Sequence, residues 1–376
     1  MKVICNKSIL SDNINIVLKA VSGRTTLPIL ECILLSAKGG GEGEEGFRLI
    51  ANDLEMGIET KNIEADIIEE GDIALDAKVF SDIVRRAPGE DVFIETKNNN
   101  ITIIKSGESE YKILGQSGEE FPFLPEVEKE NGFEISSTIL KNIIKQTIFS
   151  VSADESKPPM TGELFDISDG VLKIVSVDGF RISVRNAGID NRELSSKVIV
   201  PGKTLNEINK ILPSNEKSIT SVYLSDKHIM FETEEATVVS RLIEGNFIDY
   251  ENVFLTDCTT FLTVGCEELE SSLERASLIS REAKKSPVKL SINSDKSLVT
   301  VDSQTETGTF FEEVNGEIDG LSLEIAFNPR FLTDILKAVD EEKVQLLFTT
   351  PLSPCIIKSV ENNDYKYLVL PLRIKN

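Results

Sequence analysis

Lys203-Thr-Leu-Asn-Glu-Ile208 decides the fold, because the same order of residue types occurs once in each third of the 376-residue chain. The other two copies are Lys78-Val-Phe-Ser-Asp-Ile83 and Arg330-Phe-Leu-Thr-Asp-Ile335. In each copy a large apolar residue precedes the isoleucine by three positions, which places both on one face of a helix while the base points elsewhere. A period near one third of the chain predicts three similar domains.

Two further landmarks repeat in step with these copies. About 25 residues upstream of each, a β-rich run ends in an aspartate, at Asp53, Asp178 and Asp302, and we expect a hairpin turn and a returning strand to follow. Each third also opens with an amphipathic helix, predicted over residues 8–21, 137–151 and 267–279. Unrelated helices can look alike, but three landmarks in the same order favour a true repeat.

The expected domains are residues 1–127, 128–252 and 253–376. Phe121-Pro-Phe-Leu-Pro125 breaks the strand pattern and the acidic run at 126–130 forms the first linker, while Phe247 holds the place of Phe121 at the end of the second third. Each domain is predicted as an α+β unit of helices and antiparallel strands. Joining such units edge to edge would pair their open edges, which indicates a ring.

Within the first third we expect strands at 29–37, from 47 onward, and at 92–96, 101–105 and 111–114. A helix from Ala77 should end at the basic turn before Pro88-Gly89. The glycine-rich segment 39–46 resembles a phosphate loop, but it contains three glutamates and no following Lys-Ser or Lys-Thr. A flexible hairpin connection is therefore the better interpretation.

Several classes of enzyme are poorly supported. The single histidine, His228, reads as part of a hairpin tip rather than as a catalytic base. The odd, scattered cysteines (Cys5, Cys32, Cys258, Cys266 and Cys355) indicate neither a disulfide framework nor a zinc site. With 63 acidic residues, carboxylate-pair chemistry stays open but no pair stands out. We expect a cytoplasmic protein, since neither a membrane-spanning run nor a signal peptide is seen.

Charge is the main indication of function. A net charge of −23 argues against a broad DNA-binding surface. Five of the six predicted helices are nevertheless net positive, so the negative charge lies mostly on strands and loops. Basic helices inside an acidic shell of sheets would attract a polyanion into a central hole. A solvated helix face is the alternative, because Lys and Arg also suit helices by propensity.

Several stretches together resemble one protein family over essentially the whole chain. They are Arg24-Thr-Thr-Leu-Pro-Ile-Leu30, Asn52-Asp-Leu-Glu55, Ser176-Val-Asp-Gly-Phe-Arg-Ile-Ser183, Val198-Ile-Val-Pro201, Ser240-Arg-Leu-Ile-Glu-Gly-Asn-Phe-Ile-Asp-Tyr250, Ala326-Phe-Asn-Pro329 and Tyr367-Leu-Val-Leu-Pro-Leu-Arg373. In this order and spacing they resemble the bacterial sliding clamp, the beta subunit of DNA polymerase III.

The resemblance implies the DNA clamp fold in a head-to-tail homodimer, closed into a ring around duplex DNA with helices inside and sheets outside. It implies no catalysis, cofactor or metal. Topology would retain the DNA while salt-dependent, sequence-blind phosphate contacts permit sliding. The candidate DNA contacts are Arg24, Lys78, Lys141, Lys145, Lys203, Lys210, Arg330 and Lys337. A further arginine of the family is Ala77 here, and its paired tyrosines are Pro158-Pro159.

The resemblance also implies a pocket between the second and third domains for short peptides of the replicative polymerase, the clamp loader and other clamp-binding proteins. Apolar side chains would anchor a leucine or phenylalanine, while Arg181 or Arg373 would donate hydrogen bonds. Ile248 replaces the family's proline. The candidate pocket residues are Met160, Val177, Gly179, Phe180, Arg181, Ile182, Ile248, Val253, Asn328, Phe331, Leu352, Pro354, Leu368, Val369, Leu370, Pro371, Leu372 and Arg373.

For the contact between subunits, the resemblance implies a late first-domain strand packed against the first helix of the third domain. We expect acidic residues of the first domain to face bases of the third, a reversal of the charges in familiar relatives. The candidates are Glu108, Glu110, Tyr111, Ile113, Leu278, Ile279, Arg281, Lys284 and Lys285.

Two other classes of function compete with a clamp. A monomeric acidic adaptor or scaffold would use the same three β-rich repeats without enclosing DNA. A carboxylate-dependent hydrolase has only the abundance of acids behind it.

Overall fold

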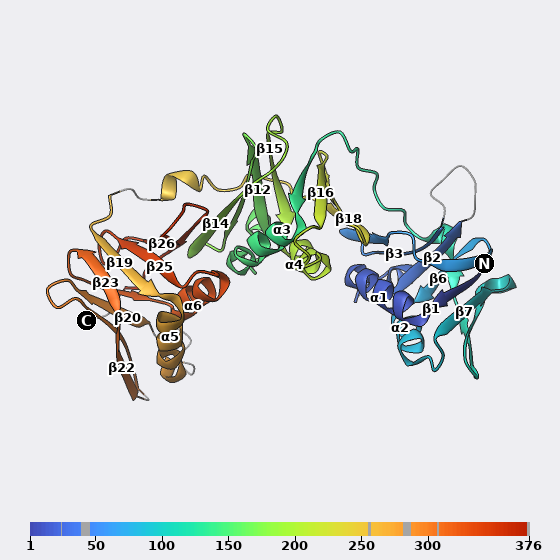
Figure 1. Cartoon of the computed structure of the whole chain (residues 1–376), viewed down its shortest axis with the longest axis horizontal. Coiled ribbons are helices and arrows are strands. Elements are labelled where there is room, and N and C mark those ends of the chain that lie inside the picture. Colours follow the sequence, from blue (N-terminus) through green and yellow to red (C-terminus); the bar gives the residue numbers. More distant parts are fainter. Residues whose placement is uncertain (24, 39–45, 255–256, 281–286, 307, 374–376) are drawn as a thin grey trace. The chain divides into compact units, whose positions relative to one another are not determined.

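The computed structural model describes residues 1–23, 25–38, 46–254, 257–280, 287–306 and 308–373. Its strand pairs are all antiparallel. The chain divides into two compact units. One comprises Met1–Thr138 and Glu207–Leu242, and the other comprises Ile139–Asn206 and Ile243–Asn376. The six α-helices of the described residues and many of the strands are labelled in Figure 1.

The first unit contains a five-stranded and a nine-stranded sheet. In spatial order, the smaller sheet consists of β5 (Ala65–Glu69), β1 (Lys2–Asn6), β7 (Asp91–Thr96), β8 (Ile101–Ser106) and β9 (Ser109–Leu114). The larger consists of β10 (Gln116–Ser117), β6 (Gly71–Asp76), β2 (Cys32–Lys38), β3 (Gly46–Asn52), β4 (Met56–Thr60), β18 (Ala236–Arg241), β17 (His228–Glu232), β16 (Ile219–Leu224) and β11 (Gly132–Ser136).

Two helices of the first unit, α1 (Lys7–Val17) and α2 (Ala77–Arg86), pack side by side against these sheets. The side chain of Asn6 caps α1, and that of Asp76 accepts a hydrogen bond from the Val79 amide at the start of α2. Such caps satisfy backbone donors that the first turn of a helix leaves unpaired. The apolar faces of both helices are buried, as the helical spacing predicts.

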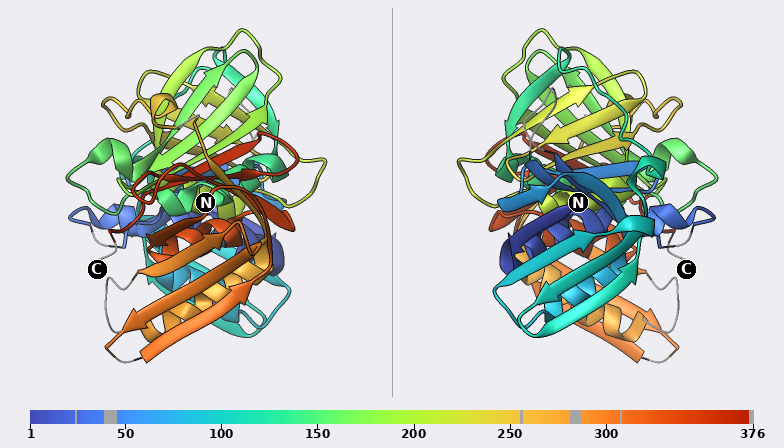
Figure 2. Two further views of the ribbon diagram at one scale, coloured as in Figure 1. Left: turned by 90° about the vertical axis from the view of Figure 1, so that its left-hand side faces the viewer. Right: turned by 90° about the vertical axis from the view of Figure 1, so that its right-hand side faces the viewer.

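The second unit has a nine-stranded and a four-stranded sheet, and the strands of the latter lie side by side in the left-hand view of Figure 2. In spatial order, the larger consists of β15 (Ser196–Pro201), β12 (Gly162–Ser168), β13 (Val171–Val177), β14 (Arg181–Gly188), β27 (Tyr365–Val369), β26 (Cys355–Ser359), β25 (Lys343–Phe348), β19 (Thr260–Gly265) and β23 (Gly316–Gly320). The smaller consists of β22 (Gly308–Val314), β21 (Leu298–Thr305), β20 (Val288–Asn293) and β24 (Leu323–Phe327).

Helices α5 (Cys266–Ser280) and α6 (Pro329–Ala338) of the second unit also pack side by side, over a core that includes Leu273, Leu332 and Ile335. The remaining helices are α3 (Ser137–Lys145) and α4 (Gly202–Ile211). Along the sequence, each of them contains a point at which the chain changes from one unit to the other.

Each nine-stranded sheet contains strands from two successive repeats, which are joined edge to edge. Within the first unit β4 pairs with β18, with Gly57 opposite Val239. Within the second, β14 pairs with β27, with Ile182 opposite Leu368. The expected pairing of edges between repeats is therefore present at both places, and it covers four strand edges, two at each junction.

Some predicted boundaries were wrong. The strand predicted over 29–37 begins at Cys32, because Pro28 starts a short 3₁₀ turn, Pro28–Glu31. In the third repeat the strand continues through Asp302 to Thr305 before the chain turns, so the hairpin is longer than in the other repeats. Two of the three predicted opening helices end earlier than expected, α1 at Val17 and α3 at Lys145, whereas α5 spans its predicted range. Most of the predicted hairpin loop at 39–46 lies outside the described residues.

The polar and thiol groups considered for catalysis are placed as structural residues. His228 begins β17, and partial burial lowers the pKa of its imidazole. The five cysteines are free, and burial raises the pKa of the Cys5, Cys32 and Cys266 thiols to about 11. Among the described residues, no group of histidine, cysteine and acidic side chains is arranged to hold a metal ion. No described helix is long and apolar enough to cross a bilayer.

Candidate functional site

The three repeat-equivalent bases occupy the same position in equivalent helices. Lys78, Lys203 and Arg330 are each the second residue of a ten-residue helix, α2, α4 and α6, and all three are exposed. The apolar pairs predicted to lie on the opposite face are buried. They are Phe80 with Ile83, Leu205 with Ile208, and Leu332 with Ile335. The sequence pattern therefore identified both the helices and their orientation correctly.

A base in the first turn is a poor choice for helix stability. The helix dipole places partial positive charge there, and a cation in this turn costs about 0.3–1 kcal/mol. The same arrangement attracts anions, because exposed backbone amides and the base act together. Its occurrence three times is more readily explained by binding of an anionic partner than by stability.

The other predicted DNA contacts lie on the same class of element. Lys141 and Lys145 are in α3, Lys210 is in the last turn of α4 and Lys337 is in the last turn of α6. All are exposed except Lys141, which is half-buried. Arg24 lies outside the described residues.

Lys210, Lys337 and Arg330 each form an ion pair with a described carboxylate. Lys210 Nζ lies 2.7 Å from Glu207 Oε1, and Lys337 Nζ lies 2.6 Å from Glu274 Oε1. Arg330 Nε is 3.8 Å from Asp334 Oδ2. Lys78 and Lys145, by contrast, form no ion pair with any residue that the structure describes. The bases are thus not equally available to an incoming phosphate.

A second feature is an apolar pocket of about 430 Å³ in the second unit. Eleven of the predicted peptide-binding residues meet there, together with Asn252, which was not predicted from the sequence. The lining residues are Met160, Val177, Gly179, Phe180, Arg181, Ile182, Ile248, Asn252, Val253, Pro354, Leu368 and Leu370. Gly179 has φ +90°, a conformation that favours glycine and lets the backbone turn at the pocket edge.

Seven predicted pocket residues do not line this cavity. Val369 is fully buried in β27, Leu372 forms a β-bridge with Ala326, and Pro371 lies between them. Asn328 caps α6, where it accepts a hydrogen bond from the Arg330 amide. Leu352 and Arg373 are exposed.

Phe331, the seventh of these residues, supports the pocket from behind. Its ring stacks on that of Phe180, with the two centroids 6.1 Å apart. Phe180 is a lining residue and is 58% exposed. The first turn of α6 thus helps to position one wall of the pocket.

Arg181 is the most heavily engaged side chain near the pocket, and only 7% of it is exposed. Its Nε donates to Asp178 Oδ2 at 2.9 Å and its Nη1 to Asp334 Oδ2 at 2.7 Å, while Nη2 donates to the Phe149 carbonyl. The guanidinium also lies over the rings of Phe149 and Phe331. Each of its three nitrogens therefore already donates a hydrogen bond within the protein.

Each of the four sheets has two edge strands, among them β9 in the first unit and β22 in the second. β9 is an edge of the five-stranded sheet, with Tyr111 exposed and Ile113 half-buried, and β22 is an edge of the four-stranded sheet, with Phe311 65% exposed. Leu278 of α5 is exposed and Ile279 half-buried. Exposed strand edges with apolar side chains are available for pairing with another chain.

The charged candidates for the subunit contact are only partly described. Glu110 already pairs with two lysines of its own sheet, with Lys105 Nζ at 2.7 Å and Lys112 Nζ at 3.2 Å. Glu108 is exposed in the turn before β9. Their expected partners Arg281, Lys284 and Lys285 lie outside the described residues.

One buried ionisable group has no counterpart in the sequence predictions. Glu163 in β12 is completely buried, and neither carboxylate oxygen accepts a hydrogen bond from a described residue. The nearby Thr147 hydroxyl instead donates to the Ile143 carbonyl at 2.8 Å. Burial raises the pKa of the Glu163 carboxyl to about 8.

Comparison with known families gives a match along almost the whole chain. The three models of the DNA polymerase III beta subunit match in order: the N-terminal domain over residues 1–125, the central domain over 134–249 and the C-terminal domain over 251–373. These ranges contain both the helix bases and the apolar pocket.

Curated relatives and solved structures agree with the family models. The beta sliding clamp of Bacillus subtilis is 33% identical and covers 99% of this chain and 100% of its own. That of Staphylococcus aureus is 34% identical and covers 96% of each. Crystal structures of a putative DNA polymerase III beta subunit from Eubacterium rectale (41% identity, TM-score 0.94) and of the Bacillus subtilis clamp (32%, 0.95) each cover 100% of both chains. The chain belongs to the beta sliding clamp family, the non-catalytic beta subunits of DNA polymerase III.

Proposed function

We propose that this DNA sliding clamp acts as a head-to-tail homodimer, which forms a ring around duplex DNA and tethers the replicative polymerase for processive synthesis. The observation that carries the proposal is the exposed base at the second position of three equivalent helices. A base repeated at this position suits a polyanion that has no preferred register. A monomeric adaptor or a hydrolase gives no reason for it.

The predicted bases would act as sequence-blind phosphate contacts. Lys78, Lys145 and Lys203 are exposed on separate helices, so each can meet a phosphate of the passing duplex. Phosphate contacts fix no sequence, and their strength falls as salt rises. Retention would then come from the closed ring, while weak contacts allow sliding. Arg24, Lys141, Lys210, Arg330 and Lys337 would complete the set.

Closure of the ring would use one edge strand of each unit, β9 and β22. We infer that β9 of one copy pairs with β22 of the other, with Tyr111 and Ile113 packed near Phe311 and Leu278. Such pairing would satisfy the backbone groups of both edges and cover their exposed apolar side chains. Glu108 would lie at the margin of the contact.

The apolar pocket would receive short peptides from the polymerase, the clamp loader and other partners. Its lining is mostly apolar, and a central apolar anchor is typical of peptide recognition. Arg181 would act by holding the wall rather than by donating to the peptide, since each of its nitrogens already donates within the protein and its side chain is largely buried. No cofactor is required. Domains at 1–127, 128–252 and 253–376, and a place in the cytoplasm, complete the proposal.

Retention on circular DNA tests the ring directly. Clamp loaded on a nicked circular plasmid should remain on it through gel filtration and should be lost after a single restriction cut, because a ring slips off a free end. Phe311→Glu, in the exposed face of β22, should abolish retention and shift the protein to a monomer in sedimentation, since it buries a charge at the contact.

Phe123→Glu is the matched control, because Phe123 is 88% exposed and lies outside both edge strands. It should leave dimerisation and retention unchanged. Equal retention of the wild-type protein on circular and linear DNA, or a monomeric wild type, would contradict the proposal.

Peptide binding should depend on the apolar lining of the pocket. Phe180→Ala removes an exposed aromatic side chain, so the fold should tolerate it, while affinity for a peptide containing a Leu-Phe pair should fall by about tenfold or more. Fluorescence anisotropy with a labelled peptide measures the loss. Phe123→Ala serves as the control, and the pocket assignment is wrong if both variants bind as tightly as the wild type.

A further inference from the structure

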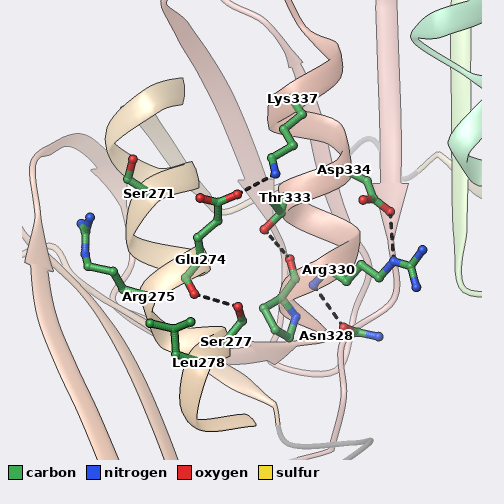
Figure 3. A pocket seen from close by; sticks show the side chains of 11 residues that line it. Ser271, Glu274, Arg275, Ser277, Leu278, Asn328, Arg330, Thr333, Asp334 and Lys337 are labelled. Atoms are coloured by element: carbon green, nitrogen blue, oxygen red, sulfur yellow. Dashed lines mark hydrogen bonds and ion pairs between the residues drawn. The ribbon is translucent and has the colours of Figure 1, made fainter. Parts of the chain in front are cut away.

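A groove of about 620 Å³ lies between α5 and α6, and both walls carry acidic and basic side chains. Figure 3 shows Lys337 and Arg330 on α6 and Glu274 on α5, with the lysine and the glutamate reaching toward each other across the groove. α5 differs from the other helices in its acidity, since its described length carries four glutamates and one arginine. The predicted DNA contacts of the third repeat thus lie beside an acidic helix.

Lys337 is held by that helix. Its Nζ lies 2.6 Å from Glu274 Oε1 and 3.9 Å from Glu270 Oε1, and the pair with Glu274 raises the pKa of the lysine. About half of each side chain of the Lys337–Glu274 pair is exposed. Exposed pairs of this kind contribute little to stability. The pair can therefore open and close at low cost.

Arg330 is held in a different manner. Asp334 Oδ2 lies 3.8 Å from Arg330 Nε, but the same oxygen accepts the much closer hydrogen bond from Arg181 Nη1 at 2.7 Å. A substitution at Asp334 would disturb the buried Arg181 as well. Glu274 has no such second duty among the side chains that the structure describes, so its effect on DNA binding can be isolated.

We propose that Glu274 sets the strength of DNA binding in the third repeat by competing with phosphates for Lys337. This inference rests on the proposed function, because it takes Lys337 to be a DNA contact. A phosphate that approaches Lys337 must displace the Glu274 carboxylate, so one ion pair is exchanged for another and the net gain is small. Glu274 also adds a negative charge beside the bound phosphate.

The consequence is a weak, easily reversed contact between Lys337 and the DNA. A clamp must release each phosphate as it moves, and a lysine that returns to a neighbouring carboxylate gives up its phosphate without leaving a bare charge. In the second repeat Lys210 is likewise paired, with Glu207 one turn earlier on its own helix, at 2.7 Å. Lys78 and Lys145, for which no ion pair is found in the described chain, would contribute more to affinity.

Glu274→Gln tests the inference in the full-length dimer. The variant keeps the shape of the side chain and removes the closer of the two carboxylates beside Lys337, so affinity for a short fluorescent duplex should rise about fivefold at low salt. The slope of log K against log salt should steepen by about 0.9, the value for one added phosphate contact. Glu267→Gln is the matched control, because it removes the same charge from an exposed position on the same helix without an ion pair to a described base.

The outcomes separate this inference from the proposed function. It is supported if only Glu274→Gln tightens binding and if Lys337→Ala cancels the gain in the double variant. It is overturned if Glu267→Gln tightens binding equally, since net charge alone would then be responsible, or if Glu274→Gln leaves affinity and salt slope unchanged while Lys78→Ala still weakens binding. Failure of the wild type to bind any duplex would remove the proposed function itself.

Discussion

Replacement of Arg181 by methionine is expected to destabilise the second unit by about 3–5 kcal/mol, because it leaves two carboxylates without their buried partner. Asp178 and Asp334 are 16% and 25% exposed, and each accepts a hydrogen bond from the guanidinium. Lysine should not rescue the loss, because a single ammonium cannot reach both carboxylates and the Phe149 carbonyl as the planar fork does. Urea unfolding of the intact chain measures the loss of stability, and hydrogen exchange of the β14 amides shows whether the loss is local to this strand.

Arg185→Met, on the same strand, is the matched comparison. Arg185 Nη1 has one carboxylate partner, Asp364 at 3.6 Å, which is 54% exposed, so the loss should be about 1 kcal/mol or less. Equal losses for the two variants would show that Arg181 does not hold the unit together. Weaker peptide binding by Arg181→Met without any loss of stability would restore Arg181 as a direct donor to the peptide.

Replacement of Glu163 by glutamine is expected to stabilise the protein increasingly as pH rises. The folded pKa of about 8 lies above the unfolded value, so the folded state retains a proton that the unfolded state loses. The stability from this proton is full below about pH 4.5 and is lost as pH rises through 8. Between about pH 5 and about pH 9 the free energy difference between variant and wild type should change by about 4 kcal/mol in favour of the variant.

Hydrogen exchange of the β12 amides, compared at each pH between variant and wild type, gives this difference without assuming two-state unfolding of the whole chain. Glu361→Gln, at an exposed position in the same unit, provides the control and should show no such trend. A difference that stays constant across the pH range would mean that Glu163 is ionised in the folded protein throughout.

The sequence was most informative where function and local geometry coincide. A base, an apolar residue and an isoleucine at fixed spacing predicted three helices, their buried faces and their exposed bases, and the structure has all three. Helical periodicity is a local property, so it can be read without knowing any tertiary contact. The returning strands after Asp53 and Asp178 were predicted correctly for the same reason.

Contacts between distant segments could be predicted only in kind. The need to cover sheet edges suggested pairing between thirds, but nothing in the sequence of β4 or β14 names β18 or β27 as its partner. The register of such pairs depends on the whole sheet. Asn252 was missed as a pocket residue because it enters through a 3₁₀ turn, Glu251–Val253, that carries no motif.

Charged side chains show the same limit. The sequence predicted Lys337 as a DNA contact and Arg181 as a donor to a peptide, without showing that the first pairs with Glu274 and the second with two aspartates. Residues 334 and 181 are far apart in the chain, so spacing along the sequence gives no sign that they meet. Net charge per helix is therefore a poor guide to which bases are available to a ligand.

The shared sheets also constrain how the protein emerges from the ribosome. After the first third has been synthesised, β4 is the outermost strand of its sheet, and its neighbour β18 ends only at Arg241. The nascent chain must therefore carry an uncovered strand for the time needed to translate more than a hundred further residues. During that interval β4 is open to pairing with a neighbouring nascent chain, a route to domain swapping or aggregation that slow translation would aggravate.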